Sequence, residues 1–242
     1  MKKILIIGYG NFGKLMADKL SPFLEVFIYN RSEITSNLEN GIKIIKKEEV
    51  KEMDYIIFGV PVQFMKDSVS EFKELISEKT IILDVSSVKV FPLEILKENF
   101  VNNQVIGTHP LFGPESIAKK IPDLKVVISN ISGKEEVIKE ISHFIENKLD
   151  FRVVEMTAEE HDKQMAKVQA LSHFIGFALR GFDLTEDLEL KTLAYRRMCA
   201  LYENVLNDTD DLFKTIQNFN PYAKEMRNNF IEHLSKIDKE LN

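Results

Sequence analysis

The segment from Gly8 to Gly13 has the residue types and the spacing of a phosphate-binding turn. Its glycines at positions 8, 10 and 13 follow an apolar run and open an amphipathic stretch. At the start of a strand–turn–helix unit, this spacing is a strong indication of a dinucleotide site. Each glycine meets one need: the first allows the tight turn, the second lets the backbone approach a pyrophosphate, and the third lets the helix pack closely on the strand. The helix N-terminus then offers free N–H groups to the phosphates. A turn that merely needs small residues is the alternative.

The residues after the second apolar run bear on which dinucleotide is bound. NAD enzymes usually carry an acidic residue there, which binds the ribose 2′-hydroxyl, whereas this chain has Asn30, Arg31 and Ser32. Asn30 removes a charge that would repel a 2′-phosphate, and Arg31 can pair with that phosphate and stack on adenine. We therefore expect NADP to be preferred, with NAD possible; an Arg31 that points to solvent is the alternative. The expected cofactor contacts are Gly8, Tyr9, Gly10, Asn11, Phe12, Gly13, Asn30, Arg31, Ser32, Val60 and Pro61.

Polar side chains also follow two later apolar runs. Ser87 and Lys89 come after the fifth run, and His109 comes after the sixth. The ligand of a parallel sheet binds at the carboxyl ends of its strands, so these side chains are expected at one edge.

A further set of polar residues falls on one long predicted helix and comprises His161, Gln169 and His173. The two histidines are twelve residues apart, so they face within roughly 120° of each other. No group of His, Cys and carboxylates has the spacing of metal ligands, and we expect no metal.

The glycine turn and the polar side chains at Ser87, Lys89 and His109 need a sheet to position them. Eight short runs are rich in Ile, Val, Leu and Phe, and several are nearly continuous, as in parallel strands buried on both faces. Helical patterns lie between many of them, for example at Asn11–Leu20, Val62–Ile76 and Lys134–Asn147. Residues 1–155 are therefore expected to form a Rossmann-type, doubly wound α/β sheet. The expected strands are Lys3–Ile7, Val26–Tyr29, Ile42–Ile45, Tyr55–Val60, Thr80–Val85, Gln104–Ile106, Lys125–Ser129 and Phe151–Val154.

The second half of the chain, residues 156–242, contains no convincing strand. Thr157 and Glu160 fit a capping box, which predicts that a helix begins there. An all-helical domain of about 85 residues is thin, so we expect it to pair with a second copy as a homodimer. The expected helices run from Thr157 to about Arg180, from about Glu186 to Leu206, from Thr209 to Phe219, and onward from Asn220-Pro221.

The composition limits the kinds of partner. The net charge of −6 argues against a general nucleic-acid binder. The single cysteine, Cys199, allows no internal disulfide and is expected to be a buried packing residue. We find no signal peptide and no apolar run approaching the roughly 18 residues that span a bilayer. We therefore expect a cytoplasmic protein with no membrane or nucleic-acid partner.

Together these motifs resemble those of the prephenate dehydrogenases, an enzyme family of tyrosine biosynthesis. They occur in the family's order over nearly the whole chain, and the segment from His109 to Pro114 is the most specific. The matching segments are the glycine turn, Ser87-Val88-Lys89, His109-Pro110-Leu111-Phe112-Gly113-Pro114, His161-Asp162, Gln169–His173 and Tyr195-Arg196. The resemblance implies an oxidative decarboxylation of prephenate to 4-hydroxyphenylpyruvate. A hydride leaves ring carbon C4 for the nicotinamide, the ring carboxylate departs as carbon dioxide, and the ring becomes aromatic.

The resemblance also implies two catalytic residues. By its position in the family motif, His109 would accept the proton of the C4 hydroxyl, which suits a histidine near neutral pH. Ser87 would hydrogen-bond the same hydroxyl or orient the histidine. The pair Asn30-Arg31 departs from the acidic residue of NAD-dependent relatives.

On the substrate side, the resemblance implies a cationic group for the side-chain carboxylate, and a bidentate arginine suits it. Arg196 is our first choice, with Arg197 and Arg180 as alternatives, because the segment around Arg196 matches the family only partly. Lys89 would add positive potential. The remaining candidates for substrate binding are His161, His173 and Gln169.

Three other functions compete with oxidation of prephenate. A close variant would oxidise arogenate, which has an amine in place of a keto group. A different β-hydroxyacid dehydrogenase or imine reductase would share the two-domain build, but the His109 segment argues against it. An NADP-sensing regulator would keep the fold without the chemistry, and the presence of both Ser87 and His109 argues against that.

Overall fold

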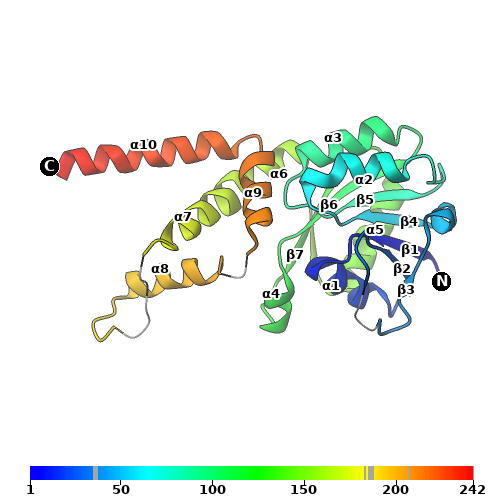
Figure 1. Ribbon diagram of the computed structural model, residues 1–242, viewed down its shortest axis with the longest axis horizontal. Coiled ribbons are helices and arrows are strands. Elements are labelled where there is room, and N and C mark those ends of the chain that lie inside the picture. The colour runs from blue at the N-terminus through cyan, green and yellow to red at the C-terminus, as the bar shows by residue number, and fades with distance from the viewer. Residues whose placement is uncertain (35–37, 183, 185–187, 207, 242) are drawn as a thin grey trace. The chain divides into compact units, whose positions relative to one another are not determined.

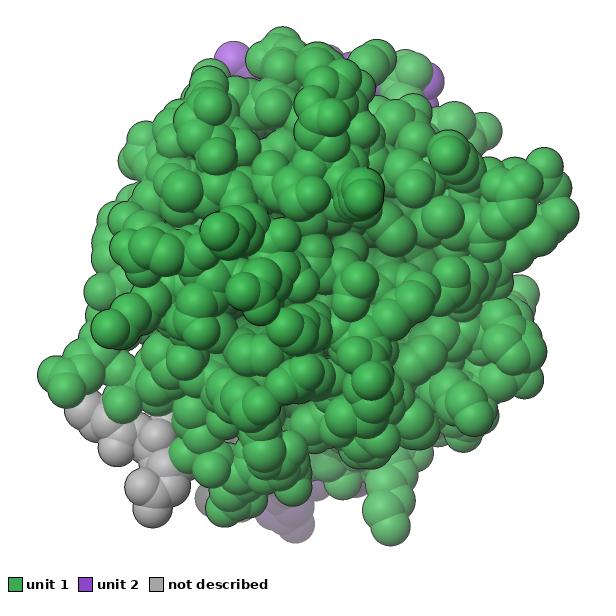
Figure 2. Space-filling view, turned by 90° about the vertical axis from the view of Figure 1, so that its right-hand side faces the viewer, with its two compact units in different colours: residues 1–161 green, residues 162–242 purple. Residues whose placement is uncertain are grey.

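The computed structural model describes residues 1–34, 38–182, 184, 188–206 and 208–241. The chain divides into two compact units, which Figure 2 colours separately: unit 1 is Met1–His161 and unit 2 is Asp162–Asn242. The division falls after residue 161 rather than after residue 155, because the helix that begins at Ala158 starts in unit 1.

Unit 1 contains one sheet of eight strands in the order β3-β2-β1-β4-β5-β6-β7-β8 (Figure 1). The chain enters in the middle at β1, winds outward to β3, and returns to β4 before winding outward again. This is the Rossmann-type, doubly wound arrangement expected from the sequence. The strands are β1 (Lys3–Ile7), β2 (Glu25–Tyr29), β3 (Lys43–Ile44), β4 (Tyr55–Phe58), β5 (Ile81–Asp84), β6 (Gln104–Pro110), β7 (Lys125–Asn130) and β8 (Arg152–Glu155).

Helices cover both faces of this sheet. Successive side chains of a strand point to opposite faces, so each face has its own core. In β1, Leu5 and Ile7 join the core with α2 and α3, whereas Ile4 and Ile6 join the core with α1 and α5. The helices of unit 1 are α1 (Asn11–Leu20), α2 (Met65–Phe72), α3 (Val90–Asn99), α4 (Pro114–Ala118), α5 (Glu135–Lys148) and the start of α6 (Ala158–Met165), with short 3₁₀ turns at Lys47–Glu52 and Val62–Phe64.

The end of the sheet corrects two expectations. Strand β7 pairs with β6 in the antiparallel sense, so the sheet is not wholly parallel. The connection over residues 111–124 holds only the five-residue helix α4, and a parallel return would need a full crossover. Strand β6 also continues to Pro110 rather than ending at Ile106. His109 therefore lies inside a strand, not in a loop after one.

Unit 2 is helical, as expected. The capping box is present, since the Thr157 hydroxyl accepts from the Glu160 N–H and the Glu160 carboxylate accepts from the Thr157 N–H. The long helix that follows is interrupted by a π-helical stretch. The expected start of the second helix, at about Glu186, lies outside the described residues. Of the residues that are described there, 188–192 are not helical, and α8 begins at Leu193, where the Thr192 side chain accepts from the Tyr195 N–H. The elements are α6, the π-helical Ala166–Leu171, α7 (Ser172–Leu179), α8 (Leu193–Glu203), α9 (Asp210–Phe219) and α10 (Ala223–Leu241).

Two caps complete unit 2. Thr209 accepts from the Leu212 N–H at the start of α9. The Asn220 side chain accepts from the Tyr222 N–H, and helix α10 begins at Ala223 rather than at Pro221. Cys199 is buried, as expected. Within the described ranges, no helix combines the length and the hydropathy that a membrane span requires.

Candidate functional site

The glycine turn depends on close backbone approaches that exclude other residues. Gly8 has a φ of +107°, and a Cβ there would lie 2.7 Å from the carbonyl oxygen of Gly59. A Cβ on Gly13 would lie 2.2 Å from the carbonyl oxygen of Gly8. The turn thus brings β1, β4 and α1 into contact through their backbones, and a side chain at either position would force them apart.

The N-terminus of α1 is open to an anion. Gly10 is the N-cap and offers no side chain to the free N–H groups, and the first turn has no acidic residue. Among the described residues, apart from Gly10 itself and its chain neighbours, no atom lies within 4 Å of the position that a Gly10 Cβ would take. Free N–H groups, the positive end of the helix dipole and open space fit the pyrophosphate of a dinucleotide. Asn11 is exposed at the start of the helix, and Phe12 is half-buried.

The end of β2 is tied to the glycine turn. The Asn30 side chain accepts a hydrogen bond of 3.0 Å from the Tyr9 N–H and donates one of 3.0 Å to the carbonyl of Ser32. Arg31 is exposed, and its guanidinium lies 5.5 Å from the centre of the Phe64 ring. Within the described part of the chain this guanidinium is in no ion pair.

Beyond β4, the remaining predicted cofactor residues lie at the same edge. The backbone of Gly59, next to the Gly8 turn, leads into Val60 and Pro61. Val60 packs against the core on the α2 and α3 face. Pro61 is exposed and precedes the turn Val62–Phe64.

His109 and His161 form a buried pair in unit 1. Nδ1 of His109 lies 2.8 Å from Nε2 of His161, and the two side chains are 4% and 0% exposed. Burial, the nearby His161 and the ammonium of Lys89 together hold the pKa of His109 well below its usual value. His109 is therefore a neutral imidazole at pH 7, with one nitrogen committed to His161. His161, which we expected among the substrate-binding residues, contacts His109 directly.

Ser87 and Lys89 follow β5, the strand beside β6. In this parallel pair Asp84 is opposite Gly107. Ser87 comes three residues after Asp84 and His109 two residues after Gly107, so both lie toward the carboxyl edge of the sheet. Ser87 is half-buried. Lys89 is fully buried and forms an ion pair with Asp84. The Asp84 carboxylate is thus a direct partner of this ammonium, which also disfavours the protonated form of His109. Sequence reasoning gave Asp84 no role, although its position five residues before Lys89 was a usable signal.

Two predicted substrate-side residues of unit 2, His173 and Gln169, are in different surroundings. Nδ1 of His173 lies 3.1 Å from a carboxylate oxygen of Asp208. Gln169 is in the π-helical stretch, and its side-chain amide oxygen is buried without a hydrogen-bond partner among the described residues. A π-helical turn inside an α-helix is frequent at functional sites.

The three candidate arginines also differ. Arg196 and Arg197 are both exposed on α8, and neither is in an ion pair within the ranges that the structure describes. Arg180 donates to the carbonyls of Val205 and Asp208 and stacks on the ring of Phe177. Its guanidinium is thus engaged inside unit 2, which leaves Arg196 and Arg197 as the available groups.

Comparisons with known proteins point to one family. The sequence model "Prephenate dehydrogenase, nucleotide-binding domain" matches residues 26–121, and "TYRAAT1-like, C-terminal domain" matches residues 179–242. "Probable arogenate/prephenate dehydrogenase" of Methanocaldococcus jannaschii is 28% identical over 204 residues, which are 79% of this chain and 44% of that protein. "Arogenate dehydrogenase 2, chloroplastic" of Arabidopsis thaliana is 26% identical over 254 residues, covering 99% of this chain and 70% of the relative.

The chain is therefore similar to the prephenate dehydrogenases, in residues 26–121 by the family model and over most of its length by the relatives. The fold agrees with this similarity. The crystal structure of prephenate dehydrogenase from A. aeolicus, in complex with hydroxyphenyl propionate and NAD⁺, matches with a TM-score of 0.74 at 18% identity. That match covers 100% of this chain and 91% of the other.

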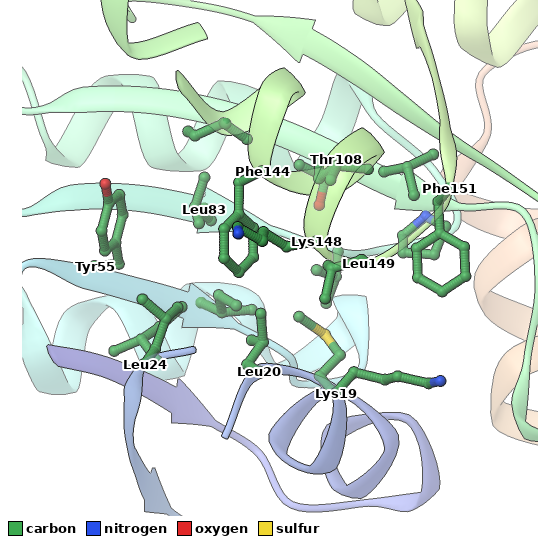
Figure 3. Close-up of a pocket in the computed structure, with 18 of the residues that line it drawn as sticks. Lys19, Leu20, Leu24, Tyr55, Leu83, Thr108, Phe144, Lys148, Leu149 and Phe151 are labelled. Carbon is green, nitrogen blue, oxygen red and sulfur yellow. The ribbon is translucent and has the colours of Figure 1, made fainter. Parts of the chain in front are cut away.

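Unit 1 also contains an apolar cavity of about 290 Å³, between α1 and α5 (Figure 3). Leu20 and Leu83 line it, and Thr108 and Pro110 line it from β6. His109 is the next residue of the strand, so its side chain points to the opposite face. Of the residues predicted for the functional site, only Phe12 lines this cavity. The cavity is thus separate from the polar groups at the carboxyl edge.

Proposed function

We propose that the protein catalyses the NADP-dependent oxidation of prephenate or arogenate, with loss of carbon dioxide. The observation that carries the proposal is the buried contact of 2.8 Å between His109 and His161. It occupies one ring nitrogen of His109 and leaves the other for a substrate. Similarity to known proteins supports the reaction class, because the relatives are named as dehydrogenases of arogenate or prephenate.

The cofactor would be held by the glycine turn and the N-terminus of α1, which have the space and the free N–H groups for a pyrophosphate. The nicotinamide, when bound, supplies the acceptor for a hydride from ring carbon C4.

His109 handles one proton in the proposed reaction. As the C4–H bond breaks, the C4 hydroxyl becomes a carbonyl and its proton moves to Nε2 of His109. The bond to the ring carboxylate then breaks, and its electron pair enters the ring as carbon dioxide leaves. The phenol oxygen takes the proton back from His109. The lowered pKa of His109 supports this role, because the imidazole is neutral before the reaction.

His161 would select the tautomer of His109. For Nε2 of His109 to accept a proton, Nδ1 has to carry a hydrogen. That Nδ1–H then donates to Nε2 of His161, over the observed 2.8 Å. His161 therefore acts on the reaction through His109, as a positioning residue.

Ser87 would donate to, or accept from, the substrate hydroxyl. In the described part of the chain its own hydroxyl makes no hydrogen bond, so it is available to a ligand.

Arg196 would bind the carboxylate of the substrate's side chain with its bidentate guanidinium. A rise in the KM for substrate in Arg196→Gln, larger than in Arg197→Gln, would support this choice. His173 and Gln169 are further candidates for the substrate side.

A preference for NADP is supported by the end of β2. Asn30 is neutral, and its side chain is used by Tyr9 and Ser32. The exposed guanidinium of Arg31, beside Phe64, can pair with a 2′-phosphate.

The experiment that tests the proposed role of His109 is the substitution His109→Asn. We expect kcat to fall by about 100-fold or more, since a general base contributes roughly that much. The dissociation constant of NADP should be unchanged. A fall in kcat of less than about tenfold would show that His109 is not the base.

A further inference from the structure

A buried ion pair lies beside the proposed catalytic histidine. Lys89 and Asp84 are both 0% exposed. Asp84 is the last residue of β5, and Lys89 lies five residues further on, directly before α3. Replacing a buried ion pair by apolar side chains is often neutral or stabilising. Folding stability is therefore a poor explanation for these two charges.

Asp84 connects this ion pair to the turn that carries Ser87. One oxygen of its carboxylate faces the Lys89 ammonium, and the other accepts hydrogen bonds from the Ser86 N–H at 3.0 Å and the Ser86 hydroxyl at 2.5 Å. Both carboxylate oxygens are thus engaged, which fixes the rotation of the side chain. The backbone of Ser86 is held as a result, and Ser87 follows it directly.

Asp84 also connects the ion pair to β6. Its carbonyl oxygen accepts a hydrogen bond of 2.8 Å from the Thr108 hydroxyl, and Thr108 is the residue before His109. A single residue at the end of β5 therefore contacts the two segments that carry Ser87 and His109.

We propose that Lys89 is a positioning residue: its ammonium holds the Asp84 carboxylate, and Asp84 fixes the Ser86–Ser87 turn relative to His109. This inference rests on the proposed function, in which Ser87 and His109 act on the same substrate hydroxyl. It differs from the role expected from the sequence, in which Lys89 itself faces the substrate. A lysine with no exposed surface and a carboxylate partner acts through its neighbours.

The two roles give different kinetics. If Lys89 bound the substrate directly, its loss would mainly raise the KM for the substrate. If Lys89 holds the turn, its loss displaces Ser87 at the reacting atoms, so kcat falls while the KM values change little. Misplacement by about 1 Å can lower a rate by 100-fold.

The test uses two variants, Lys89→Met and the double variant Asp84→Asn/Lys89→Met. The double variant leaves no unpaired buried charge, so it serves as the test if the single variant fails to fold. The control is Lys97→Met, on the exposed side of α3. We expect kcat to fall by about tenfold or more in both test variants, with KM values within about threefold of wild type, and no change in the control. A kcat within about twofold of wild type in the folded double variant would overturn the proposal, and so would a selective rise in the KM for the substrate.

A second readout does not depend on turnover. The titratable groups that face His109 are His161 from α6 and Lys89, the latter paired with Asp84. An NMR titration of the imidazole carbons follows the pKa of His109 in the resting protein, with His109→Asn identifying its signal. Because the Lys89 ammonium disfavours a second positive charge, Lys89→Met should raise the pKa of His109. An unchanged pKa in that variant would contradict the placement of the Lys89–Asp84 pair beside His109, on which the positioning role depends. A wild-type protein that turns over neither prephenate nor arogenate would contradict the proposed function alone.

Discussion

Nδ1 of His109 lies 2.8 Å from Nε2 of His161, and both rings are buried. Only one of the two nitrogens can carry the shared hydrogen. If His109 carries it, Nε2 of His109 is a hydrogen-bond acceptor and can take a proton from a substrate. The relationship between these two histidines thus determines which nitrogen of His109 is basic.

Substitution of His161 tests this relationship. His161→Leu removes the acceptor, so His109 loses its fixed tautomer and orientation. We expect kcat to fall by about 10- to 100-fold, with the KM for substrate changed much less. The matched control is His233→Leu, an exposed histidine on α10, which should leave kcat unchanged. If His161→Leu raised KM and preserved kcat, His161 would be a substrate ligand.

The pH dependence of the reaction follows from the lowered pKa of His109. Burial, His161 and Lys89 all disfavour its protonated form. The neutral, active form should therefore persist as the pH falls below the ordinary histidine value of about 6.5. We expect log kcat/KM to be flat near neutrality and to decline only well below that value. An acidic limb at or above about 6.5 would contradict the assignment of this group as the base.

The choice of cofactor can be tested at Arg31. Arg31→Ala removes the guanidinium proposed for the 2′-phosphate, so the KM for NADP should rise by about tenfold or more, while the KM for NAD should change little. Lys51→Ala, at an exposed position in the turn Lys47–Glu52, is the control for loss of a surface cation. Wild-type protein with a clear preference for NAD would exclude the proposed role of Arg31.

The last helix offers a test of the proposed homodimer. In α10, Ile231, Leu234 and Ile237 are about half exposed and recur at helical spacing. Such an exposed apolar stripe is typical of an interaction surface. Leu234→Asp combined with Ile237→Asp should therefore shift the mass measured by light scattering from dimer to monomer. Lys239→Asp, on the opposite side of the helix, should not, and a monomeric wild type would contradict the proposal.

Much of unit 1 is predictable because its signals are local. The run Lys3–Ile7 and the stretch Asn11–Leu20 became β1 and α1 with the expected bounds. The steric need for Gly8 and Gly13 follows from their spacing. The direction of β7 was not predictable in this way, because an antiparallel strand buried on both faces has the same apolar pattern as a parallel one.

The contacts of the candidate site are harder to predict because they join distant residues. His109 and His161 are 52 positions apart, and no local pattern indicates that they meet. Lys89 was expected to add positive potential on the substrate side, and its buried ion pair with Asp84 was not part of that expectation. Asn30 was expected among the cofactor contacts, and no local pattern indicates that its side chain also bonds to the backbone of Tyr9 and Ser32. For His109, Lys89 and Asn30 alike, a hydrogen bond or ion pair that no local pattern indicates determines a neighbour of the side chain.

The most direct test of the central claim is the rate at which the purified protein reduces NADP in the presence of prephenate, followed by absorbance and repeated with arogenate and with NAD. We predict turnover with at least one of the two substrates, carbon dioxide released in equal amount to the reduced cofactor, and a higher kcat/KM with NADP than with NAD. Tight binding of NADP without turnover of either substrate would contradict the account.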